Sequence, residues 1–161
     1  MNKLTLENVK NIFENNDSFE YEYNSNSESN TKKLGNEFAK YIKKGDVITL
    51  NGELGSGKTV FLMGIASYFG IENDVCSPTF TIVNEYTTNM DYPIYHFDVY
   101  RLEDSDEFLE GVGTDYFYNG VCLIEWGDAV ISDILPKNTI HIDIQKDAND
   151  LNLRKFKIWR K

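Results

Sequence analysis

The sequence predicts an α/β fold, a single domain in which one mixed sheet is flanked by helices. The first observation is a glycine-rich stretch, residues 52–59, which fits the pattern G-x-x-x-x-G-K-[ST]. The second is its setting, because a β-branched apolar run precedes it at 47–50 and a proline-free segment with helical apolar spacing follows it at 60–69. The third is a series of further short apolar or alternating runs typical of strands. Strand, loop and helix in this order predict a phosphate-binding P-loop and a P-loop NTPase-like fold, with strands parallel around the loop and antiparallel elsewhere.

Before this loop the sequence shows one strand pattern between two helix patterns. Residues 4–16 place apolar side chains roughly on one side of a short helix, which is weakly specified, so we expect 1–16 to be an N-terminal appendage. Residues 19–23 alternate and predict a strand with its aromatic side chains on one face. The polar stretch 24–30 is typical of a turn or helix cap, and 31–42 has helical apolar spacing.

The elements next to the loop have the clearest patterns. The polar residues 43–46 set off the short run at 47–50, which predicts a buried strand. The helix after the loop has one apolar side that can face a sheet. Its members are Phe61, Leu62, Ile65, Ala66 and Phe69. Gly70 is placed to cap its carboxyl end.

Strand patterns dominate the middle of the chain. Residues 80–87 and 94–100 each predict a strand, and the short gap between them predicts an antiparallel hairpin. Residues 104–107 have the side chains that cap a helix start. The apolar run 121–125 predicts a buried strand that ends in a carboxylate.

The last third predicts a short helix and a closing pair of strands. The helix occupies 128–135 and stops at Pro136, and the strands are expected at 139–144 and 153–159. The end of the chain, 153–161, is a basic closing strand and tail without an acidic residue. Its basic residues are Arg154, Lys155, Lys157, Arg160 and Lys161. Protection of an edge strand is one explanation for the lysines, and contact with tRNA or a partner is the other.

Composition restricts the class of protein. A chain of 161 residues with 41% hydrophobic and 14% aromatic residues fits one globular domain with a real core. A formal charge of −10 argues against a protein that grips nucleic acid unaided over a broad surface. With no apolar run that could span a membrane and no signal peptide, we expect a cytoplasmic protein. Cys76 and Cys122 lack metal or redox spacing and are expected to be buried reduced thiols.

The P-loop motif predicts how phosphates would be bound. Its glycines let the backbone turn several N–H groups toward the α- and β-phosphates of a nucleotide, and the next helix adds its positive end. Lys58 would reach the β- and γ-phosphates, and the Thr59 hydroxyl would bind Mg²⁺. The expected nucleotide contacts are Glu53, Leu54, Gly55, Ser56, Gly57, Lys58 and Thr59. Thr79 is either a switch-type residue that senses the γ-phosphate or simply a threonine at the start of a strand.

Two acids could complete a catalytic site. Asp98 and Glu125 each follow an apolar strand, and carboxylates at such positions commonly lie beside a P-loop. The alternative for each is a solvated turn residue. We favour Glu125 for the metal or its attacking water, and Asp98 for supporting the Mg²⁺–γ-phosphate site. His96 could line the same pocket but is expected to be a hydrogen-bonded packing residue, and Trp126 could cover the site, fill the core or contact a partner.

The small number of cationic side chains expected near the γ-phosphate predicts slow phosphoryl transfer. The chain has three arginines, and two of them lie in the basic tail, so only Lys58 and, as one alternative, Arg101 are placed to act near the γ-phosphate. Arg101 could equally form a surface ion pair with Glu103 or Asp104. Unaided phosphoryl transfer usually surrounds the γ-phosphate with several cationic donors. We therefore expect weak turnover in isolation and a partner that supplies or orders the missing part.

Over residues 19–145 the chain resembles the bacterial TsaE family, also called YjeE, small P-loop ATPases required for making threonylcarbamoyladenosine in tRNA. The stretches that resemble it are Thr31-Lys32-Lys33-Leu34-Gly35, Gly52 to Thr59, Ser77-Pro78-Thr79-Phe80, Asn84-Glu85-Tyr86, His96-Phe97-Asp98-Val99-Tyr100-Arg101-Leu102 and Ile124-Glu125-Trp126. The P-loop is shared by a vast superfamily, whereas the combination of S-P-T-F, H-F-D-x-Y-R-L and E-W is specific to this family.

The resemblance implies a cofactor, site residues and partners. The nucleotide would be ATP with Mg²⁺, Lys58 and Thr59 match the family's P-loop pair, and Asp98 and Glu125 match its functional acids. Trp126 matches the tryptophan beside the second acid. The partners would be the TsaD and TsaB proteins, with tRNA reached through their complex and no membrane involved. TsaD would transfer the threonylcarbamoyl group to the adenosine next to the anticodon, while the ATP cycle of this chain would reset or permit turnover.

Two other functions remain open at the level of sequence. A small-molecule kinase would share the P-loop, but such enzymes tend to have an arginine-bearing lid, and no arginine-rich segment follows the core. A non-catalytic nucleotide-sensing module would use ATP only to shape a binding surface, and the two placed acids argue against it.

Overall fold

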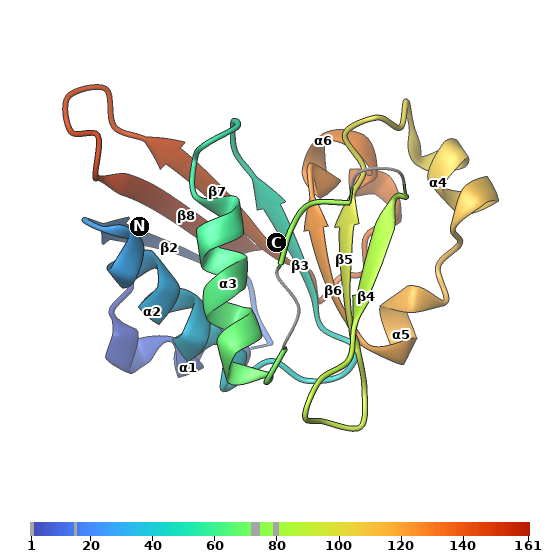
Figure 1. Ribbon diagram of the computed structural model, residues 1–161, viewed down its shortest axis with the longest axis horizontal. Coiled ribbons are helices and arrows are strands. Elements are labelled where there is room, and N and C mark those ends of the chain that lie inside the picture. The colour runs from blue at the N-terminus through green and yellow to red at the C-terminus, as the bar shows by residue number, and fades with distance from the viewer. Residues whose placement is uncertain (1, 15, 72–74, 79–80) are drawn as a thin grey trace.

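A computed structural model of the chain describes residues 2–14, 16–71, 75–78 and 81–161. Its eight strands form one sheet in the order β1-β2-β8-β7-β3-β6-β5-β4 (Figure 1). The strands are β1 (Asn2–Lys3), β2 (Phe19–Ser25), β3 (Val47–Asn51), β4 (Val83–Tyr86), β5 (Ile94–Asp98), β6 (Val121–Glu125), β7 (Ile140–Lys146) and β8 (Arg154–Arg160). The α-helices are α1 (Lys10–Glu14), α2 (Glu28–Ala39), α3 (Lys58–Tyr68), α4 (Ser105–Gly111), α5 (Tyr116–Asn119) and α6 (Gly127–Val130), with short 3₁₀ turns η1 (Leu6–Asn8) and η2 (Ser132–Ile134).

The sheet is parallel at its centre, as expected, and antiparallel toward its sides, except that the short strand β1 pairs in parallel with β2 at one edge, which the sequence did not predict. Strand β3 pairs in parallel with β6 on one side and β7 on the other, and β5 extends the parallel part beyond β6. The predicted hairpin of β4 and β5 is antiparallel, and so are the pairs β7–β8 and β8–β2. Since β3, β5 and β6 run in the same direction, their carboxyl ends meet at one edge of the sheet.

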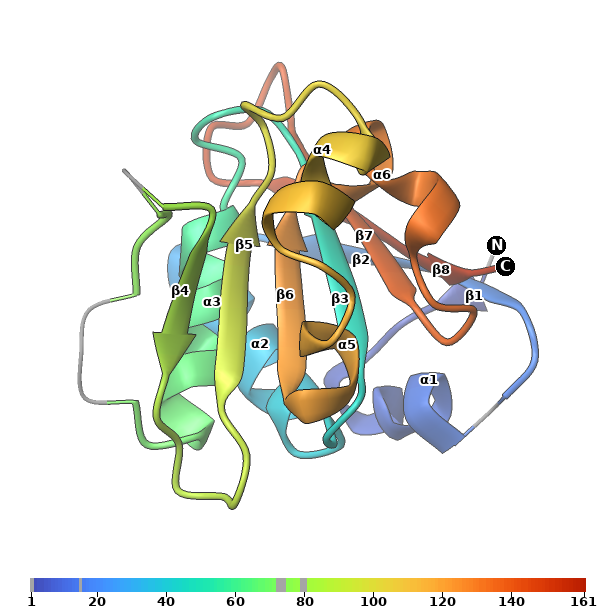
Figure 2. The ribbon, with the colours of Figure 1, turned by 90° about the vertical axis from the view of Figure 1, so that its right-hand side faces the viewer.

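Helices cover both faces of the sheet, and each face has its own apolar core (Figures 1 and 2). Alternate residues of the central strands point to opposite cores, so Ile48 and Leu50 pack with the layer of α2 and α3, while Val47 packs with the layer of α4 and α5. The predicted inner side of α3 is buried in full, from Phe61 to Phe69. Gly70 follows with a φ of +66°, the left-handed conformation expected of a helix-ending glycine.

The N-terminal segment is not an appendage. Leu4, Val9 and Ile12 are buried in the same core as α2, and Leu4 N donates to the carbonyl of Glu22 on β2. The predicted helix is replaced by η1 and the short α1. The segment is therefore helical in two short pieces, and its few apolar side chains are stabilised by packing against the main core rather than by helix length.

Helices α2 and α3 cross with their backbones in contact. At the crossing, Gly35 of α2 lies against the Phe61 carbonyl, and Gly64 of α3 lies against the Lys32 carbonyl, so closely that a Cβ at either position would overlap a backbone atom. Helix α2 begins at Glu28, earlier than predicted, because Ser27 caps it by accepting a hydrogen bond of 3.0 Å from Asn30 N. The crossing therefore fixes the first turn of α2 relative to the start of α3.

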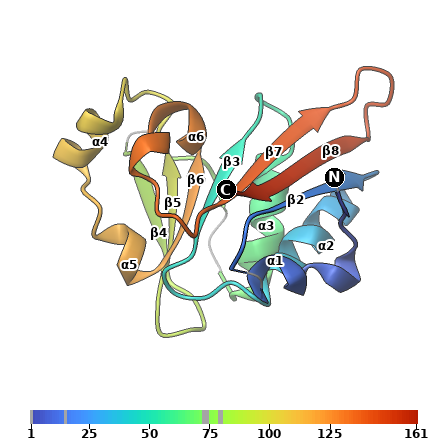
Figure 3. The same cartoon turned by 180° about the vertical axis from the view of Figure 1, so that it is seen from behind.

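Strand β8 lies inside the sheet, between β2 and β7 (Figure 3). The explanation of its lysines as edge-strand protection is therefore wrong, because β8 is hydrogen-bonded on both sides. Lys157 lies 3.2 Å from a Glu20 carboxylate oxygen, and Lys155 lies 3.9 Å from one of Asp147. Within the described residues, every helix falls short of the length and apolar character that a membrane crossing requires.

The two cysteines differ in exposure, which corrects the expectation that both are buried. Cys122 is fully buried on β6, and burial raises the pKa of its thiol to about 12, whereas Cys76 is exposed. We expect one thiol per chain to react with a disulfide reagent at pH 8 in the native protein and the second to react only after unfolding, because the reactive species is an accessible thiolate. Two fast-reacting thiols in the native wild type, or one in Cys76→Ser, would contradict this.

Candidate functional site

The predicted P-loop connects β3 to α3 in a tight turn. Gly57, the residue before α3, has a φ of +112°, and Gly52 is so close to the sheet that a Cβ there would lie 2.6 Å from the Ile144 carbonyl oxygen. Helix α3 begins at Lys58 with its free backbone N–H groups directed at the loop. The loop therefore has the backbone form that receives an anion at a helix N-terminus.

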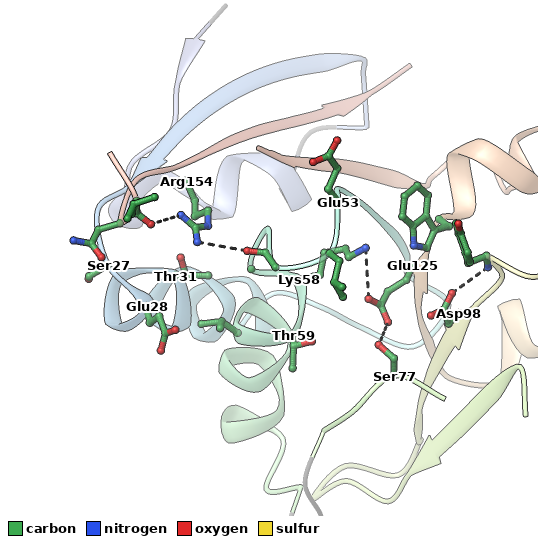
Figure 4. A pocket seen from close by; sticks show the side chains of 18 residues that line it. Ser27, Glu28, Thr31, Glu53, Lys58, Thr59, Ser77, Asp98, Glu125 and Arg154 are labelled. Atoms are coloured by element: carbon green, nitrogen blue, oxygen red, sulfur yellow. Dashed lines mark hydrogen bonds and ion pairs between the residues drawn. The ribbon is translucent and has the colours of Figure 1, made fainter. Parts of the chain in front are cut away.

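A cavity of about 780 Å³ opens beside this loop, at the carboxyl ends of the parallel strands (Figure 4). Residues from the P-loop, β5, β6, the first turn of α2 and the β7–β8 hairpin line it. They are Ser27, Glu28, Thr31, Glu53, Leu54, Gly55, Gly57, Lys58, Thr59, Val60, Ser77, Asp98, Tyr100, Glu125, Trp126, Leu151, Asn152 and Arg154. The size falls in the range of small-molecule sites.

Lys58 is held among polar and aromatic groups in this cavity. Its side chain is buried, and its Nζ donates a 2.6 Å hydrogen bond to the Gly52 carbonyl and lies 3.9 Å from Glu125 Oε1. The ammonium also lies 4.6 Å from the ring centre of Trp126, a cation–π contact. Burial lowers the pKa of Lys58, and the charges of Glu125 and Asp98 oppose that effect.

Glu125 is a buried carboxylate with three polar neighbours. Its Oε2 lies 2.8 Å from His96 Nε2 and accepts a 2.7 Å hydrogen bond from the Ser77 hydroxyl. Burial alone raises the pKa of Glu125, but the hydrogen bond and charge of His96, the Ser77 hydrogen bond and the charge of Lys58 outweigh it, so the pKa lies below the usual range. The side chain is therefore kept as a carboxylate although it is 3% exposed.

Asp98 and Thr59 complete the polar end of the cavity. Asp98 ends β5 directly opposite Glu125 on β6, and its Oδ1 accepts a hydrogen bond from Tyr100 N. Thr59 lies in the first turn of α3 and lines the cavity (Figure 4). Among the described residues no three His, Cys, Asp or Glu side chains cluster as metal ligands. Mg²⁺ commonly takes one or two protein oxygens together with phosphates and water, so Thr59 and these acids suit that ion.

The other residues predicted to contact the nucleotide divide into three groups. Glu53, Leu54, Gly55 and Gly57 line the cavity. Ser56 instead lines a smaller cavity of about 370 Å³ behind the loop, and its buried hydroxyl has no hydrogen-bond partner among the described residues. Thr79 lies outside the described residues, so its switch role stays a prediction.

The open alternatives for the aromatic and basic residues are partly resolved. His96 is the buried, hydrogen-bonded residue that we expected, and its partner is Glu125. Trp126 covers Lys58, as one alternative proposed, and takes the left-handed φ of +66°, rare for a tryptophan. Arg101 is not among the residues that line the cavity, whereas Arg154 is.

Sequence reasoning missed Ser77, Arg154 and the first turn of α2 as cavity residues. One signal for Arg154 was present, because alternation along β8 places it on the same face as the buried Phe156 and Ile158. An arginine on the inner face of a strand needs polar partners, and here they are backbone carbonyls of the hairpin and the P-loop. No sequence signal connects Ser77 to Glu125, which is 48 residues away.

The His96–Glu125 contact predicts a pH-dependent loss of stability. Without Mg²⁺ or nucleotide, His96→Ala should lower the free energy of unfolding at pH 7 by about 2 kcal/mol, because a buried carboxylate loses a partner. In the wild type, the lowered pKa of Glu125 contributes stability above its unfolded pKa that is lost as the pH falls through the folded pKa. In the variant, burial would dominate and raise the pKa, so the destabilisation should be larger at pH 7 than at pH 4.

Urea unfolding at both pH values measures this difference. The matched control is the same His96→Ala change in a Glu125→Gln background, where no carboxylate titrates and the destabilisation should be equal at the two pH values. If His96→Ala destabilises the protein that keeps Glu125 equally at pH 4 and pH 7, the proposed effect of His96 on the pKa of Glu125 is contradicted.

Comparisons with known proteins identify the family of the chain. The family model for the threonylcarbamoyl adenosine biosynthesis protein TsaE matches residues 25–156. A tRNA threonylcarbamoyladenosine biosynthesis protein TsaE of Bacillus subtilis is 44% identical over 122 residues, which are 74% of this chain and 74% of that protein. The TsaE protein of Treponema pallidum is 37% identical over 75% of this chain and 88% of its own length.

A solved structure has a similar fold. The crystal structure of Bacillus subtilis YdiB superposes with a TM-score of 0.66 and 32% sequence identity, over 91% of this chain and 88% of that chain. The family match spans α2, the P-loop, both acid-bearing strands and the start of β8. From its P-loop, its paired strand-end acids and these matches, the chain belongs to the TsaE family of threonylcarbamoyl adenosine biosynthesis proteins.

Proposed function

We propose that this chain is a Mg²⁺-dependent ATP-binding protein and weak ATPase that is required for threonylcarbamoyladenosine modification of tRNA and acts with the TsaD–TsaB complex. The observation that supports it most is the meeting of Lys58, Thr59, Asp98 and Glu125, from three different elements, in one cavity beside the P-loop. The names of the relatives, which are tRNA threonylcarbamoyladenosine biosynthesis proteins, support the pathway.

Each residue has a role that its geometry suits. The N–H groups of the loop and of the α3 N-terminus would receive the phosphates, and the Lys58 ammonium would exchange its bond to the Gly52 carbonyl for phosphate oxygens. Thr59 and Glu125 would hold the metal, with Asp98 supporting them from the adjacent strand. When bound, Mg²⁺ supplies neutralisation of charge on the phosphate oxygens. Glu125, held ionised by its neighbours, would orient or deprotonate the attacking water.

The same contacts would make hydrolysis slow without partners. Glu125 Oε2 is occupied by Ser77 and His96, and Lys58 is occupied by Gly52 and Glu125, so the reactive groups bond to one another. These bonds must rearrange before hydrolysis. Binding of the TsaD–TsaB complex would favour the rearranged state, which agrees with a role in permitting turnover of that complex rather than performing the transfer.

The test is ATP hydrolysis by the purified protein, alone and with TsaD, TsaB and tRNA. We expect a slow rate alone, a strong rise with the partners, and loss of both rates in Lys58→Ala, because that change removes the cation of the P-loop. Lys157→Ala on the solvent-facing side of β8 is the control for loss of a lysine. A fast rate that needs no partner, or an unaffected Lys58→Ala variant, would contradict the proposal.

A further inference from the structure

A group of three hydrogen-bonded side chains lies outside the cavity, where β3, β7 and α6 meet. Asp128 of α6 accepts a 2.8 Å hydrogen bond at Oδ2 from Asn51 Nδ2 at the end of β3. Its other oxygen, Oδ1, lies 2.6 Å from His141 Nδ1 on β7. These three residues, here called the Asp128 bridge, are all within the described part of the chain, and none of them lines the cavity that contains Lys58.

The strands hold the Asp128 bridge rigidly on one side. Asn51 Nδ2 also donates a 3.2 Å hydrogen bond to the Ile142 carbonyl of β7. The His141 side chain is only 12% exposed, and its ring stacks on that of Trp159 of β8 with ring centres 5.2 Å apart. Asp128 is the member of the bridge that comes from a short helix, so its two hydrogen bonds connect the start of α6 to the sheet.

The sequence neighbours of the bridge are two groups that contact Lys58. Asn51 directly precedes Gly52, whose carbonyl accepts the 2.6 Å hydrogen bond of the Lys58 ammonium. Asp128 follows two residues after Trp126, whose ring centre lies 4.6 Å from the same ammonium. The hydrogen bond between Asn51 and Asp128 therefore joins the two segments that contact the lysine of the P-loop.

The backbone of Trp126 needs support of this kind. Its φ of +66° is left-handed, which is unfavourable for a bulky side chain and persists only where the surrounding structure fixes it. Before the turn, Trp126 N donates a 3.0 Å hydrogen bond to the Leu50 carbonyl of β3. After it, Gly127 lies so close to β3 that a Cβ there would be 2.8 Å from Thr49 Cγ2, and Asp128 makes the bridge. The turn is thus fastened to β3 at both of its ends.

We propose that Asn51, Asp128 and His141 are positioning residues, which keep the ring of Trp126 over the Lys58 ammonium. Without the bridge, the turn would relax toward a negative φ, and the ring would move away from Lys58 toward solvent. The effect on Trp126 concerns the protein without any ligand. Its consequence for ATP hydrolysis rests on the proposed function, because only there does the orientation of Lys58 affect a reaction.

Acrylamide quenching of Trp126 fluorescence, without nucleotide, tests the position of the ring. The chain has two tryptophans, so a Trp159→Phe background reports on Trp126 alone and keeps an aromatic ring beside His141. Asp128→Ala removes the bridge, whereas Asp128→Asn is the conservative change, because its amide oxygen and nitrogen can replace both hydrogen bonds. Asp106→Ala, at an exposed position on α4, controls for the loss of an aspartate.

We expect Asp128→Ala to increase the quenching constant about twofold, because the lost hydrogen bonds should shift the equilibrium between the two positions of the ring by about tenfold. Asp128→Asn and Asp106→Ala should stay close to the background protein. His141→Phe, which breaks one of the two bonds and keeps a ring, should give a smaller increase and tests the bridge if Asp128→Ala does not fold. Quenching that is unchanged in folded Asp128→Ala or His141→Phe, or equally increased in Asp128→Asn and Asp128→Ala, would overturn the inference.

A double-mutant cycle distinguishes positioning from a general loss of stability. Asp128→Ala should lower kcat of partner-stimulated ATP hydrolysis about tenfold when Trp126 is present. In a Trp126→Ala background the same change should lower kcat by less than twofold, since the bridge acts through that ring. Equal losses in both backgrounds would refute the positioning role. If the wild type itself does not hydrolyse ATP, the proposed function fails, and the quenching measurements still decide whether the bridge holds Trp126.

Discussion

Glu125→Gln is expected to reduce partner-stimulated ATP hydrolysis by about 100-fold or more while changing ATP binding by less than threefold. Glutamine has the same shape and can still accept a hydrogen bond from Ser77, so the pocket should persist. It lacks the negative charge that would act on the metal and the attacking water. The prediction therefore separates a hydrolysing enzyme from a nucleotide-sensing module, since a module needs only the bound state.

The measurement pairs steady-state hydrolysis with calorimetric binding of ATP to the same preparations. Glu110→Gln, an exposed position on α4 outside the cavity, controls for the loss of one carboxylate. Thermal unfolding of each variant shows whether the fold is retained. A Glu125→Gln protein that hydrolyses ATP at the wild-type rate, or that supports the tRNA modification in full, would favour the sensing module.

Gly64→Ala is expected to lower the free energy of unfolding by about 3 kcal/mol or more, and Gly35→Ala by a similar amount. At both positions the new methyl group would overlap a backbone carbonyl of the facing helix, so the two helices would have to separate. Because the backbone cannot adjust as a side-chain rotamer does, this loss exceeds the gain in helix propensity of alanine over glycine. In a chain of this size such a loss lowers the melting temperature by roughly 6–12 °C.

Gly111→Ala is the matched control for the helix crossing. Gly111 ends α4, its φ is not in the left-handed range, and a Cβ there meets nothing within 4 Å. This variant should be neutral or slightly more stable than the wild type, since alanine loses less backbone entropy on folding. Thermal unfolding of the three variants tests the prediction, and a Gly64→Ala melting temperature equal to that of Gly111→Ala would refute it.

Local sequence patterns were sufficient to predict the strands and the helix around the P-loop. The apolar spacing of α3, the β-branched run of β3 and the apolar run that ends at Glu125 all specify their own conformation, and the structure confirms them. The paired acids could also be predicted, because Asp98 and Glu125 end neighbouring strands that run in the same direction. Such features depend on residues close together in the chain and on one rule of sheet geometry.

Contacts between distant segments could not be predicted in this way. Nothing in the pattern of β8 says that it lies between β2 and β7, so the sequence leaves an edge strand open as one explanation of its lysines and places Arg154 in a basic tail. The Ser77–Glu125 bond and the close approach of Gly35 and Gly64 likewise depend on how finished elements pack. The packing of the N-terminal segment could not be predicted either. Its short apolar pattern does not show that Leu4, Val9 and Ile12 are buried in the main core.

The position of β8 has a consequence for how the chain folds during synthesis. Strand β2 is made early, yet its main partner in the sheet is β8, which follows every other strand in the chain. Until β8 leaves the ribosome, β2 and the outer side of β7 keep unpaired backbone groups, which favour pairing with other chains. The same late segment contains Arg154, so completion of the sheet and completion of the cavity wall occur in one step. A nascent chain that ends before Arg154 is therefore expected to be protease-sensitive and to bind ATP weakly.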